Sequence, residues 1–427
     1  MLTAIPRYGA RVLPNTIQVI SAIDAAGQFI EGPHLRQFEV AFGARFGGAH
    51  AVSTSFSRMA CYYTLKALDL APGGEVVLPA LTFWVIPEIV RAAGFRPVFV
   101  DVDPETFVMT PQALARAVGP RTVAVVPTHL WGLPCDMEGI MDLARAHRLA
   151  VIEDCAHALG ATFKGQPVGT FGDAGFFSFQ TLKPLNTYGG GMAIARDAGL
   201  AERIRRLAAA EPLPTEKSIR KKLWHGRVQR ISVRPRIFTW TLFPVLWASA
   251  YLNMNPDVFL WERIQSLDPL PASYRERYAN VQAALGLEAL KHLDRWTATT
   301  QAHAAEISRR LAGVPGVRLP VVPSDRTHVV YQYCAYVPDR DDTVLRCLKR
   351  GVDLETLHVD VCTRLPLFQP FAAPAPGADA TAHAVQIPVY ESLTANEVER
   401  VGTIVHDAVM PSPATAASRA QPGNAIH

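Results

Sequence analysis

Between about residues 52 and 195 the chain alternates short β-branched, apolar runs with segments in which apolar residues recur at helical spacing. The short runs predict β-strands, and the segments between them predict helices that cover the strands. The predicted strands are residues 76–78, 97–102, 122–126, 150–152, 176–179 and 192–195. The predicted helices are residues 59–70, 86–93, 111–118 and 137–147. This alternation indicates βαβ units and therefore a large α/β domain with a doubly wound, mostly parallel sheet.

The pattern changes at residues 212–271, which begin with clustered Lys and Arg, continue with an apolar run and end in Asn and Pro. We interpret this segment as an insertion. The later predicted elements are a long helix over residues 274–311, strands over 328–337 and 385–388, and a helix over 394–408. Thr394 and Glu397 are spaced as a capping box at the start of the last helix.

These patterns divide the chain into three parts. Residues 1–275 are expected to form an N-terminal arm and the large domain, with the insertion at about 212–271. Residues 276–408 are expected to form a smaller C-terminal α/β domain. Residues 409–427 are rich in Ala, Pro and Ser, which is typical of a disordered tail.

Composition narrows the class of protein. The 427 residues are 49% hydrophobic and 19% charged, which is typical of a globular protein with a large core. The net charge of +4 is too small to indicate nucleic acid as a partner. The six cysteines show neither a Cys-x-x-Cys pair nor zinc-ligand spacing, so we expect no metal site and no disulfide framework. With no secretory signal at the first residues, a cytoplasmic location is expected.

Two strand ends carry candidate catalytic groups. Asp154 follows the predicted strand at 150–152, and ligands of parallel sheets bind at the carboxyl ends of strands. Taken alone, Asp154 could equally be a helix cap. Lys183 follows a second strand end and precedes a run of glycines, where backbone can approach a ligand closely. An acid and a lysine at neighbouring strand ends fit a pyridoxal phosphate site, in which the lysine bonds to the cofactor and the carboxylate holds its pyridine nitrogen.

Further motifs extend this pattern along the chain. They are Gly32-Pro33 to Phe46, Gly74 to Pro79, Gly94 to Asp101, Thr128 to Gly132, Glu153 to His157, Phe177 to Lys183 and Tyr278 to Leu287. In this order they resemble the motifs of the DegT/DnrJ/EryC1/StrS aminotransferases, a branch of the fold type I enzymes that depend on pyridoxal phosphate. The resemblance runs from about residue 32 to residue 405, apart from the insertion.

The resemblance implies a role for each matching residue. Lys183 would be the lysine that bonds to the cofactor, and Asp154 the partner of the pyridine nitrogen. His157 stands near the expected position of the cofactor's phenolic oxygen, where the family often has Gln. Phe83 takes the place of the aromatic residue stacked on the cofactor ring, and Ser178 that of the hydroxyl which binds the phosphate.

Ser57, Arg58 and Met59 occupy the family's phosphate-binding loop, and here the chain departs from the family. Ser57 stands in place of a glycine and Arg58 in place of a threonine. A guanidinium matches phosphate geometry, so Arg58 is still expected to pair with the phosphate.

The family also takes an Asn-x-Arg segment from a neighbouring subunit. Arg275-Glu276-Arg277 fills that place, so Arg277 carries over and the asparagine does not. The resemblance therefore implies a homodimer in which Arg277 completes the partner's site.

Four other residues near these motifs have open alternatives. Trp84 and Trp131 could line a substrate pocket, although large aromatic residues beside strand ends belong more often to the core. His129 either faces the cofactor or is a structural histidine. Cys155 is expected to be a small buried residue rather than a nucleophile.

The resemblance implies a transaminase that moves an amino group from an amino-acid donor, L-glutamate in many members, to a keto acceptor. The commonest acceptor in the family is a keto sugar on a nucleotide, in polysaccharide, glycolipid or secondary-metabolite biosynthesis. Two alternatives stay open: an acceptor that is a lipid-linked or otherwise hydrophobic ketone at a membrane surface, and a non-catalytic regulatory or scaffold protein that binds the cofactor. The presence of Lys183 argues against the last.

The apolar run within the insertion, residues 237–252, is too short for a membrane crossing and is interrupted by Pro244. The run either packs against the dimer or over the site, or it lies on a membrane. In the second case residues 217–261 would make peripheral contact with anionic headgroups at the inner face of the membrane.

Overall fold

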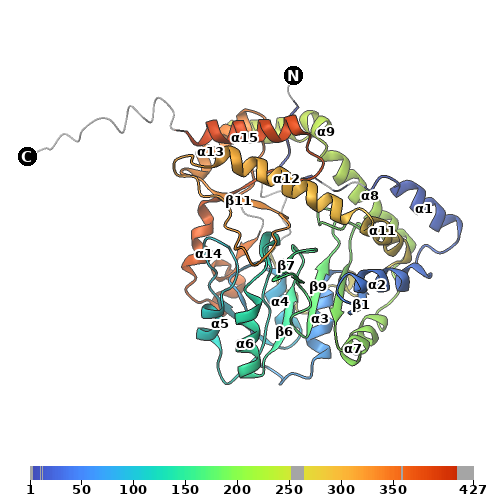
Figure 1. Ribbon diagram of the computed structural model, residues 1–427. Helices are drawn as coiled ribbons and strands as arrows, with labels where there is room; N and C mark the ends of the chain where they lie inside the picture. Colours follow the sequence, from blue (N-terminus) through green and yellow to red (C-terminus); the bar gives the residue numbers. More distant parts are fainter. Residues whose placement is uncertain (1–2, 10, 12, 252–263, 357–358, 411–427) are drawn as a thin grey trace, which may run out of the picture.

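A seven-stranded sheet lies at the centre of the computed structural model, which describes residues 3–9, 11, 13–251, 264–356 and 359–410 (Figure 1). Its strand order is β1-β10-β9-β6-β5-β2-β4. The strands are β1 (His50–Thr54), β2 (Glu75–Pro79), β4 (Arg96–Val100), β5 (Thr122–Val125), β6 (Ala150–Asp154), β9 (Ala174–Ser178) and β10 (Gly191–Ala195). β10 pairs antiparallel with both of its neighbours, β1 and β9, and all other pairs in this sheet are parallel. The predicted α/β class with a mostly parallel sheet is confirmed, while β1 was not predicted.

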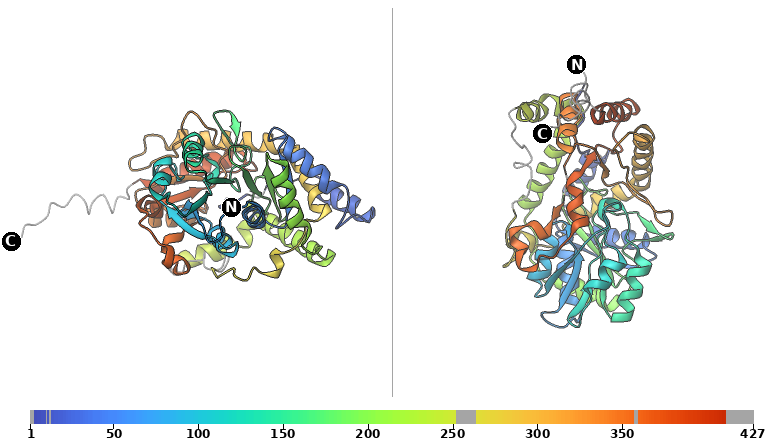
Figure 2. Two further views of the ribbon diagram at one scale, coloured as in Figure 1. Left: turned by 90° about the horizontal axis from the view of Figure 1, so that it is seen from below. Right: turned by 90° about the vertical axis from the view of Figure 1, so that its left-hand side faces the viewer.

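Helices cover both faces of this sheet (Figure 2). The helices of this part of the chain are α1 (Thr16–Ala25), α2 (His34–Ala44), α3 (Ser57–Ala67), α4 (Val85–Ala92), α5 (Pro111–Ala117), α6 (Met137–His147) and α7 (Ala198–Ala209). Capping side chains begin several of them: the Asp197 carboxylate accepts the Leu200 N–H at 2.6 Å at the start of α7. Short pairs β3 (Leu81–Thr82) with β12 (Asp360–Val361) and β7 (Thr162–Phe163) with β8 (Gln166–Pro167) lie outside the large sheet.

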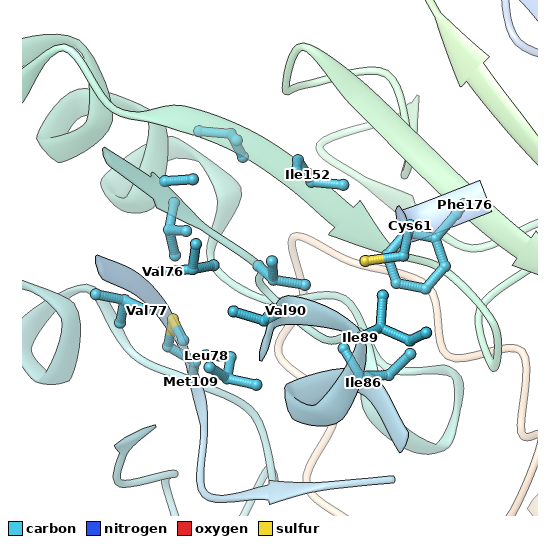
Figure 3. Close-up of a cluster of buried hydrophobic side chains, with 14 of the residues drawn as sticks. Cys61, Val76, Val77, Leu78, Ile86, Ile89, Val90, Met109, Ile152 and Phe176 are labelled. Atoms are coloured by element: carbon cyan, nitrogen blue, oxygen red, sulfur yellow. The ribbon is translucent and has the colours of Figure 1, made fainter. Parts of the chain in front are cut away.

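The central strands read as continuous apolar runs because both of their faces are covered. Val76, Val77 and Leu78 of β2 are all fully buried, although their side chains point alternately to opposite faces. Figure 3 shows part of this core, where Cys61 of α3 and Ile89 of α4 lie near the strands. The core thus holds the strand ends rigidly in place.

The C-terminal part has its own hydrophobic core, drawn from residues 304–409 together with Ile5. Figure 1 shows three of its helices, Leu293–Leu311, Arg340–Lys349 and Ala395–Val409, above the large sheet. Its elements are α11 (Asn280–Leu290), α12 (Leu293–Leu311), β11 (Tyr333–Tyr336), α13 (Arg340–Lys349), α14 (Pro376–Ala380), β13 (Ala384–Ile387) and α15 (Ala395–Val409), with short 3₁₀ turns at Cys362–Arg364, Pro366–Phe371 and Thr381–His383. Two further 3₁₀ turns precede this part, Leu130–Gly132 after β5 and Ala272–Tyr274 before α11. The capping box of Thr394 and Glu397 is confirmed. The division of the chain at residue 275 stays a prediction.

Two predicted elements of this part are wrong in extent. The single helix over 274–311 is instead α11 and α12, with a turn at Lys291 and His292 between them, and residues 275–279 are not helical. These residues instead carry the chain past the sheet edge, where the Ser55 hydroxyl donates to the Tyr274 carbonyl at 2.5 Å. The strand predicted over 328–337 is limited to β11.

The insertion consists of α8 (Glu216–Ser232), α9 (Pro235–Trp240) and α10 (Phe243–Tyr251). Residues 252–263 of the insertion and 411–427 of the predicted tail lie outside the described residues, whereas α15 continues to Val409. None of the described helices combines the length and apolar character that crossing a membrane requires.

Candidate active site

Strand register brings several predicted site residues to one edge of the sheet. Ser178, the last residue of β9, pairs with Gly191, which in turn pairs with Thr54 at the end of β1. The N-terminus of α3, at Ser57, therefore lies beside Ser178. The approach is so close that a Cβ on Gly191 would lie 2.3 Å from the Ser57 backbone nitrogen, so only glycine fits. Asp154 ends β6, the parallel neighbour of β9, at the same edge.

A cavity of about 470 Å³ opens at this edge. Of the nine predicted site residues, the following seven line it: Ser57, Arg58, Phe83, Asp154, His157, Ser178 and Lys183. They lie at or after the ends of four strands, β1, β3, β6 and β9, as expected for a ligand site at the carboxyl edge of an α/β sheet.

Lys183 is the only lysine among the described residues of the cavity lining. Its Nζ donates a hydrogen bond to the Tyr331 hydroxyl at 3.1 Å and lies 4.4 Å from the centre of the Tyr331 ring. Burial lowers the pKa of Lys183 to about 7; the Asp154 carboxylate opposes this effect, and the Arg58 guanidinium adds to it. A large fraction of Lys183 is therefore an uncharged, nucleophilic amine at neutral pH.

Asp154 is a buried carboxylate that faces the cavity. Burial raises its pKa to about 6, while the N–H that Ala156 donates at 3.0 Å and the positive charge of Lys183 lower it. The carboxylate thus caps the turn after β6 and also lines the site, so the cap interpretation does not exclude a role in binding. A cationic ring nitrogen is the kind of partner that would keep this carboxylate ionised.

Glu153 precedes Asp154 on the strand and therefore points to the opposite face. Its carboxylate is completely buried and accepts N–H groups from Gly169 at 2.6 Å, Phe171 at 2.7 Å and Gly172 at 2.9 Å. His129 Nε2 lies 3.1 Å from the same carboxylate, and His129 Nδ1 accepts the N–H of Cys135. His129 is therefore a structural histidine beneath the site and not part of the cavity lining.

Arg58 lies in the first turn of α3, among aromatic rings. Its guanidinium donates to the Tyr274 hydroxyl at 2.5 Å and lies 4.8–5.6 Å from the ring centres of Tyr274, Phe56 and Phe83. Such contacts stabilise a cation that is partly removed from water. The same charge adds to the positive potential of the first turn of α3, where backbone N–H groups attract anions.

Two threonines of the cavity lining have a hydroxyl buried without a hydrogen-bond partner among the described residues. They are Thr82, after β2, and Thr128, after β5. An unpaired buried hydroxyl is costly, so both positions call for a ligand with polar atoms. Together with the ring of Phe83, the carboxylate of Asp154 and the anion-attracting turn at Ser57, they fit a flat aromatic ligand that carries a phosphate.

Two predicted residues lie outside the cavity lining. The Met59 side chain is completely buried in the core beneath α3, so only its backbone could face a ligand. Arg277 lies in a separate hollow and approaches Glu31 at 3.6 Å. Its expected contribution to a partner's site stays a prediction.

The structure adds residues that sequence reasoning missed. Tyr331 reaches Lys183 from the C-terminal part and stacks on His157, with the ring centres 4.3 Å apart. Tyr274 and Gln229 line the cavity from the segments after and within the insertion. No local motif marks these three positions, because their place in the site depends on how distant segments fold together. Trp84 and Trp131 are buried and do not line the cavity, and Cys155 is completely buried.

The chain is similar over most of its length to several known proteins. A sequence profile of the DegT/DnrJ/EryC1/StrS aminotransferase family matches residues 13–236 and 246–406. The "pleiotropic regulatory protein" of Geobacillus stearothermophilus is 31% identical over 343 residues, which cover 79% of this chain and 78% of that protein. The dTDP-4-dehydro-2,3,6-trideoxy-D-glucose 4-aminotransferase of Saccharopolyspora spinosa is 30% identical over 400 residues, 92% of this chain and 94% of that enzyme. The crystal structure of the aminotransferase TlmJ from Streptoalloteichus hindustanus matches with a TM-score of 0.76 and 27% identity, covering 97% of this chain and all of that one.

Proposed function

The chain belongs to the DegT/DnrJ/EryC1/StrS aminotransferase family, whose members depend on pyridoxal phosphate, and we propose that it aminates a keto sugar carried on a nucleotide. The observation that carries the proposal is Lys183, a buried amine whose pKa is lowered to about 7, beside the Asp154 carboxylate in a cavity at the sheet edge.

The residues of the cavity fit pyridoxal phosphate. Asp154 would hold the ring nitrogen, Phe83 would lie against the ring and His157 near its oxygen, while Ser178 and the first turn of α3 at Ser57 would receive the phosphate. When bound, this cofactor supplies an aldehyde that bonds to amines and a ring that withdraws electrons.

The chain's own groups supply the proton transfers. Lys183 Nζ can take up a proton and release it again near neutral pH, because its pKa lies near 7. Tyr331 holds Nζ in place through its hydroxyl. The buried part of the lining, which includes Leu130 and Val359, keeps bulk water away from this exchange.

The nature of the acceptor is supported by the charges around the cavity. The relative from Saccharopolyspora spinosa acts, by its name, on a dTDP-linked keto sugar. In this chain, Lys222 of α8 lies 5.6 Å from the centre of the Phe56 ring, which lines the cavity, and Arg58 lies within the lining. Arg58 suits a phosphate of the nucleotide, and Lys222, whose Nζ pairs with the Glu276 carboxylate at 2.9 Å, would have to exchange that partner to bind another. L-glutamate as donor, a homodimer completed by Arg277 and a cytoplasmic location belong to the same proposal.

The test has two stages. Borohydride reduction of the purified protein with cofactor, followed by peptide mass mapping, should place the label on Lys183. Incubation with L-glutamate and a panel of dTDP-, UDP- and GDP-linked keto sugars should then yield 2-oxoglutarate and an aminated sugar nucleotide by mass spectrometry. Turnover of hydrophobic ketones alone would replace the sugar acceptor in the proposal. Labelling of Lys183 without any turnover would favour a regulatory role, in keeping with the name of the Geobacillus relative.

A further inference from the structure

The insertion helices present an apolar surface to solvent. We define the outer face of the insertion as the exposed apolar residues of α8, α9, α10 and the turn between α9 and α10: Trp224, Val228, Ile231, Ile237, Trp240, Leu242, Val245 and Trp247. Trp224, Val228 and Ile231 recur at spacings of four and three and so form one stripe along α8. Exposure is 64% for Trp224, 71% for Trp240 and 65% for Val245. Figure 2 shows these helices at one edge of the molecule, in yellow-green.

The helices that carry the outer face are packed against the rest of the protein. On the opposite side of α9 and α10, Phe238 and Leu246 are buried in a cluster with Ala4 and Leu348. The Ala4 N–H donates to the Thr239 hydroxyl at 2.7 Å. The inner side of these helices is therefore fixed to the protein, and the apolar side chains on the outer side are held towards solvent.

Positive charge surrounds the outer face. Residues 215–251 contain eight Lys and Arg against one acid, a net charge of +7 in a chain whose total is +4, so all other residues together sum to −3. Lys217, Lys221, Arg234 and Arg236 have no ion-pair partner among the described residues. The cationic character of the protein is thus concentrated where its apolar residues are exposed.

We propose that the outer face of the insertion binds the surface of an anionic lipid bilayer. Exposed tryptophans beside unpaired cations fit the boundary between headgroups and acyl chains. A second copy of this chain fits less well, because a twofold interface through the same face would bring two segments of charge +7 together. The family profile matches residues 13–236 and 246–406, so Ile237, Trp240, Leu242 and Val245 lie in the part that the profile does not cover. Trp224, Val228, Ile231, Trp247 and the four unpaired cations lie within the matched ranges, so the profile leaves out only the middle of the surface.

Docking would place the cavity beside the membrane, because α8 is also part of the site. Gln229, next to Val228 of the outer face, lines the cavity. On the inner side of α8, a Cβ on Gly226 would lie 2.2 Å from the Tyr188 ring, so the helix packs directly on the loop that carries Lys183. Arg230 donates to the Tyr188 hydroxyl at 2.7 Å. An acceptor at the membrane surface would thus reach the site along α8.

Vesicle co-sedimentation tests the proposal with the full-length protein carrying its cofactor. We expect binding to vesicles that contain phosphatidylglycerol, weakening with added salt, and no binding to vesicles of phosphatidylcholine alone. Each cation near the surface contributes about a factor of five in partitioning, so changing Lys217, Lys221, Arg234 and Arg236 together to Gln should weaken binding roughly several hundredfold. Trp240→Ser with Val245→Ser should also weaken it.

The controls change the same numbers of residues elsewhere. Changing exposed Lys66, Arg148, Arg206 and Arg295 to Gln alters the net charge equally, and Val321→Ser with Val322→Ser removes two exposed apolar residues; both should bind vesicles as the unchanged protein does. Vesicle binding that is absent, or that responds equally to both sets, would overturn the proposal. So would sedimentation that shows a dimer lost only in the Trp240 and Val245 variant, because the face would then be a protein interface. Transamination of soluble acceptors without vesicles stays unchanged in every variant, which separates this test from that of the proposed function.

Discussion

Replacing Glu153 by Gln should destabilise the protein strongly while leaving the cavity intact. Glu153 does not line the cavity, yet its two carboxylate oxygens accept four hydrogen bonds beneath it. One oxygen accepts the N–H groups of Phe171 and Gly172, and the other accepts those of Gly169 and the His129 ring. A glutamine keeps one oxygen and presents an NH₂ group to the other two donors.

The cost follows from the donors that lose their acceptor. His129 cannot adapt by moving its proton, because its Nδ1 accepts the N–H of Cys135, so Nε2 must carry the hydrogen. Either orientation of the amide therefore leaves two buried donors unpaired. Hydrogen bonds to a charged acceptor contribute about 1.5–3 kcal/mol each, so Glu153→Gln should lower the free energy of unfolding by about 3–6 kcal/mol. At roughly 2.1 cal/mol/K per residue, a chain of 427 residues shifts by about 1 °C per kcal/mol, so Tm should fall by about 3–7 °C.

Thermal unfolding at fixed cofactor concentration measures this effect, since bound cofactor itself raises Tm. The matched control is Glu138→Gln, because Glu138 is exposed and its ion pair with Lys164 contributes little. At 25 °C the folded Glu153→Gln protein should keep a near-normal kcat. A Tm within about 2 °C of the unchanged protein would refute the account of Glu153 as the buried acceptor that holds residues 169–172 under the site.

Four further predictions concern the site and the dimer. Lys183→Ala should abolish both turnover and borohydride labelling, whereas Lys291→Ala, at an exposed position, should keep both by activity assay and peptide mapping. Asp154→Asn should retain the cofactor but lower kcat roughly a hundredfold or more, and near-normal turnover would show that the carboxylate acts only as a cap. Because Lys183 loses its proton near pH 7, covalent cofactor uptake by the cofactor-free protein should rise through about pH 7 and then level off. The Asp154 carboxylate raises the pKa of Lys183, so Asp154→Asn should shift this profile to lower pH. Sedimentation should show a homodimer, and Arg277→Ala should weaken cofactor binding while the protein stays a dimer. A fully active monomer would contradict this prediction.

The large sheet and most of its edge could be predicted because they depend on local patterns. Strands buried on both faces must be apolar along their length, so β2, β5 and β6 stand out from the helices between them. In contrast, β1 contains His50, Ser53 and Thr54 and pairs with β10 at the edge of the sheet, so its pattern is weak. Polar groups at strand ends, such as Asp154, could be predicted as well, because each directly follows an apolar strand.

The rest of the site depends on contacts between segments far apart in the chain. Tyr331 meets Lys183 across 148 positions, and nothing in its neighbourhood predicts that contact. The turn between α11 and α12 was missed because apolar residues keep helical spacing through it. The sequence shows that the insertion is rich in apolar and basic residues. Which of its apolar residues are exposed, and which are buried as Phe238 and Leu246 are, follows only from the structure.

A contact between distant segments also explains how the chain accommodates Arg58, where the family has threonine. An arginine in place of threonine brings a charge into a partly buried loop, which is costly unless the charge is compensated. Tyr274, which directly precedes the Arg275-Glu276-Arg277 segment, compensates it with a hydroxyl at 2.5 Å and an aromatic face. The guanidinium held there lowers the pKa of Lys183, as burial does, and so favours the uncharged amine. Arg58 and Tyr274 therefore form one contact unit, and the cation that we propose as a partner of the phosphate also favours the uncharged form of Lys183.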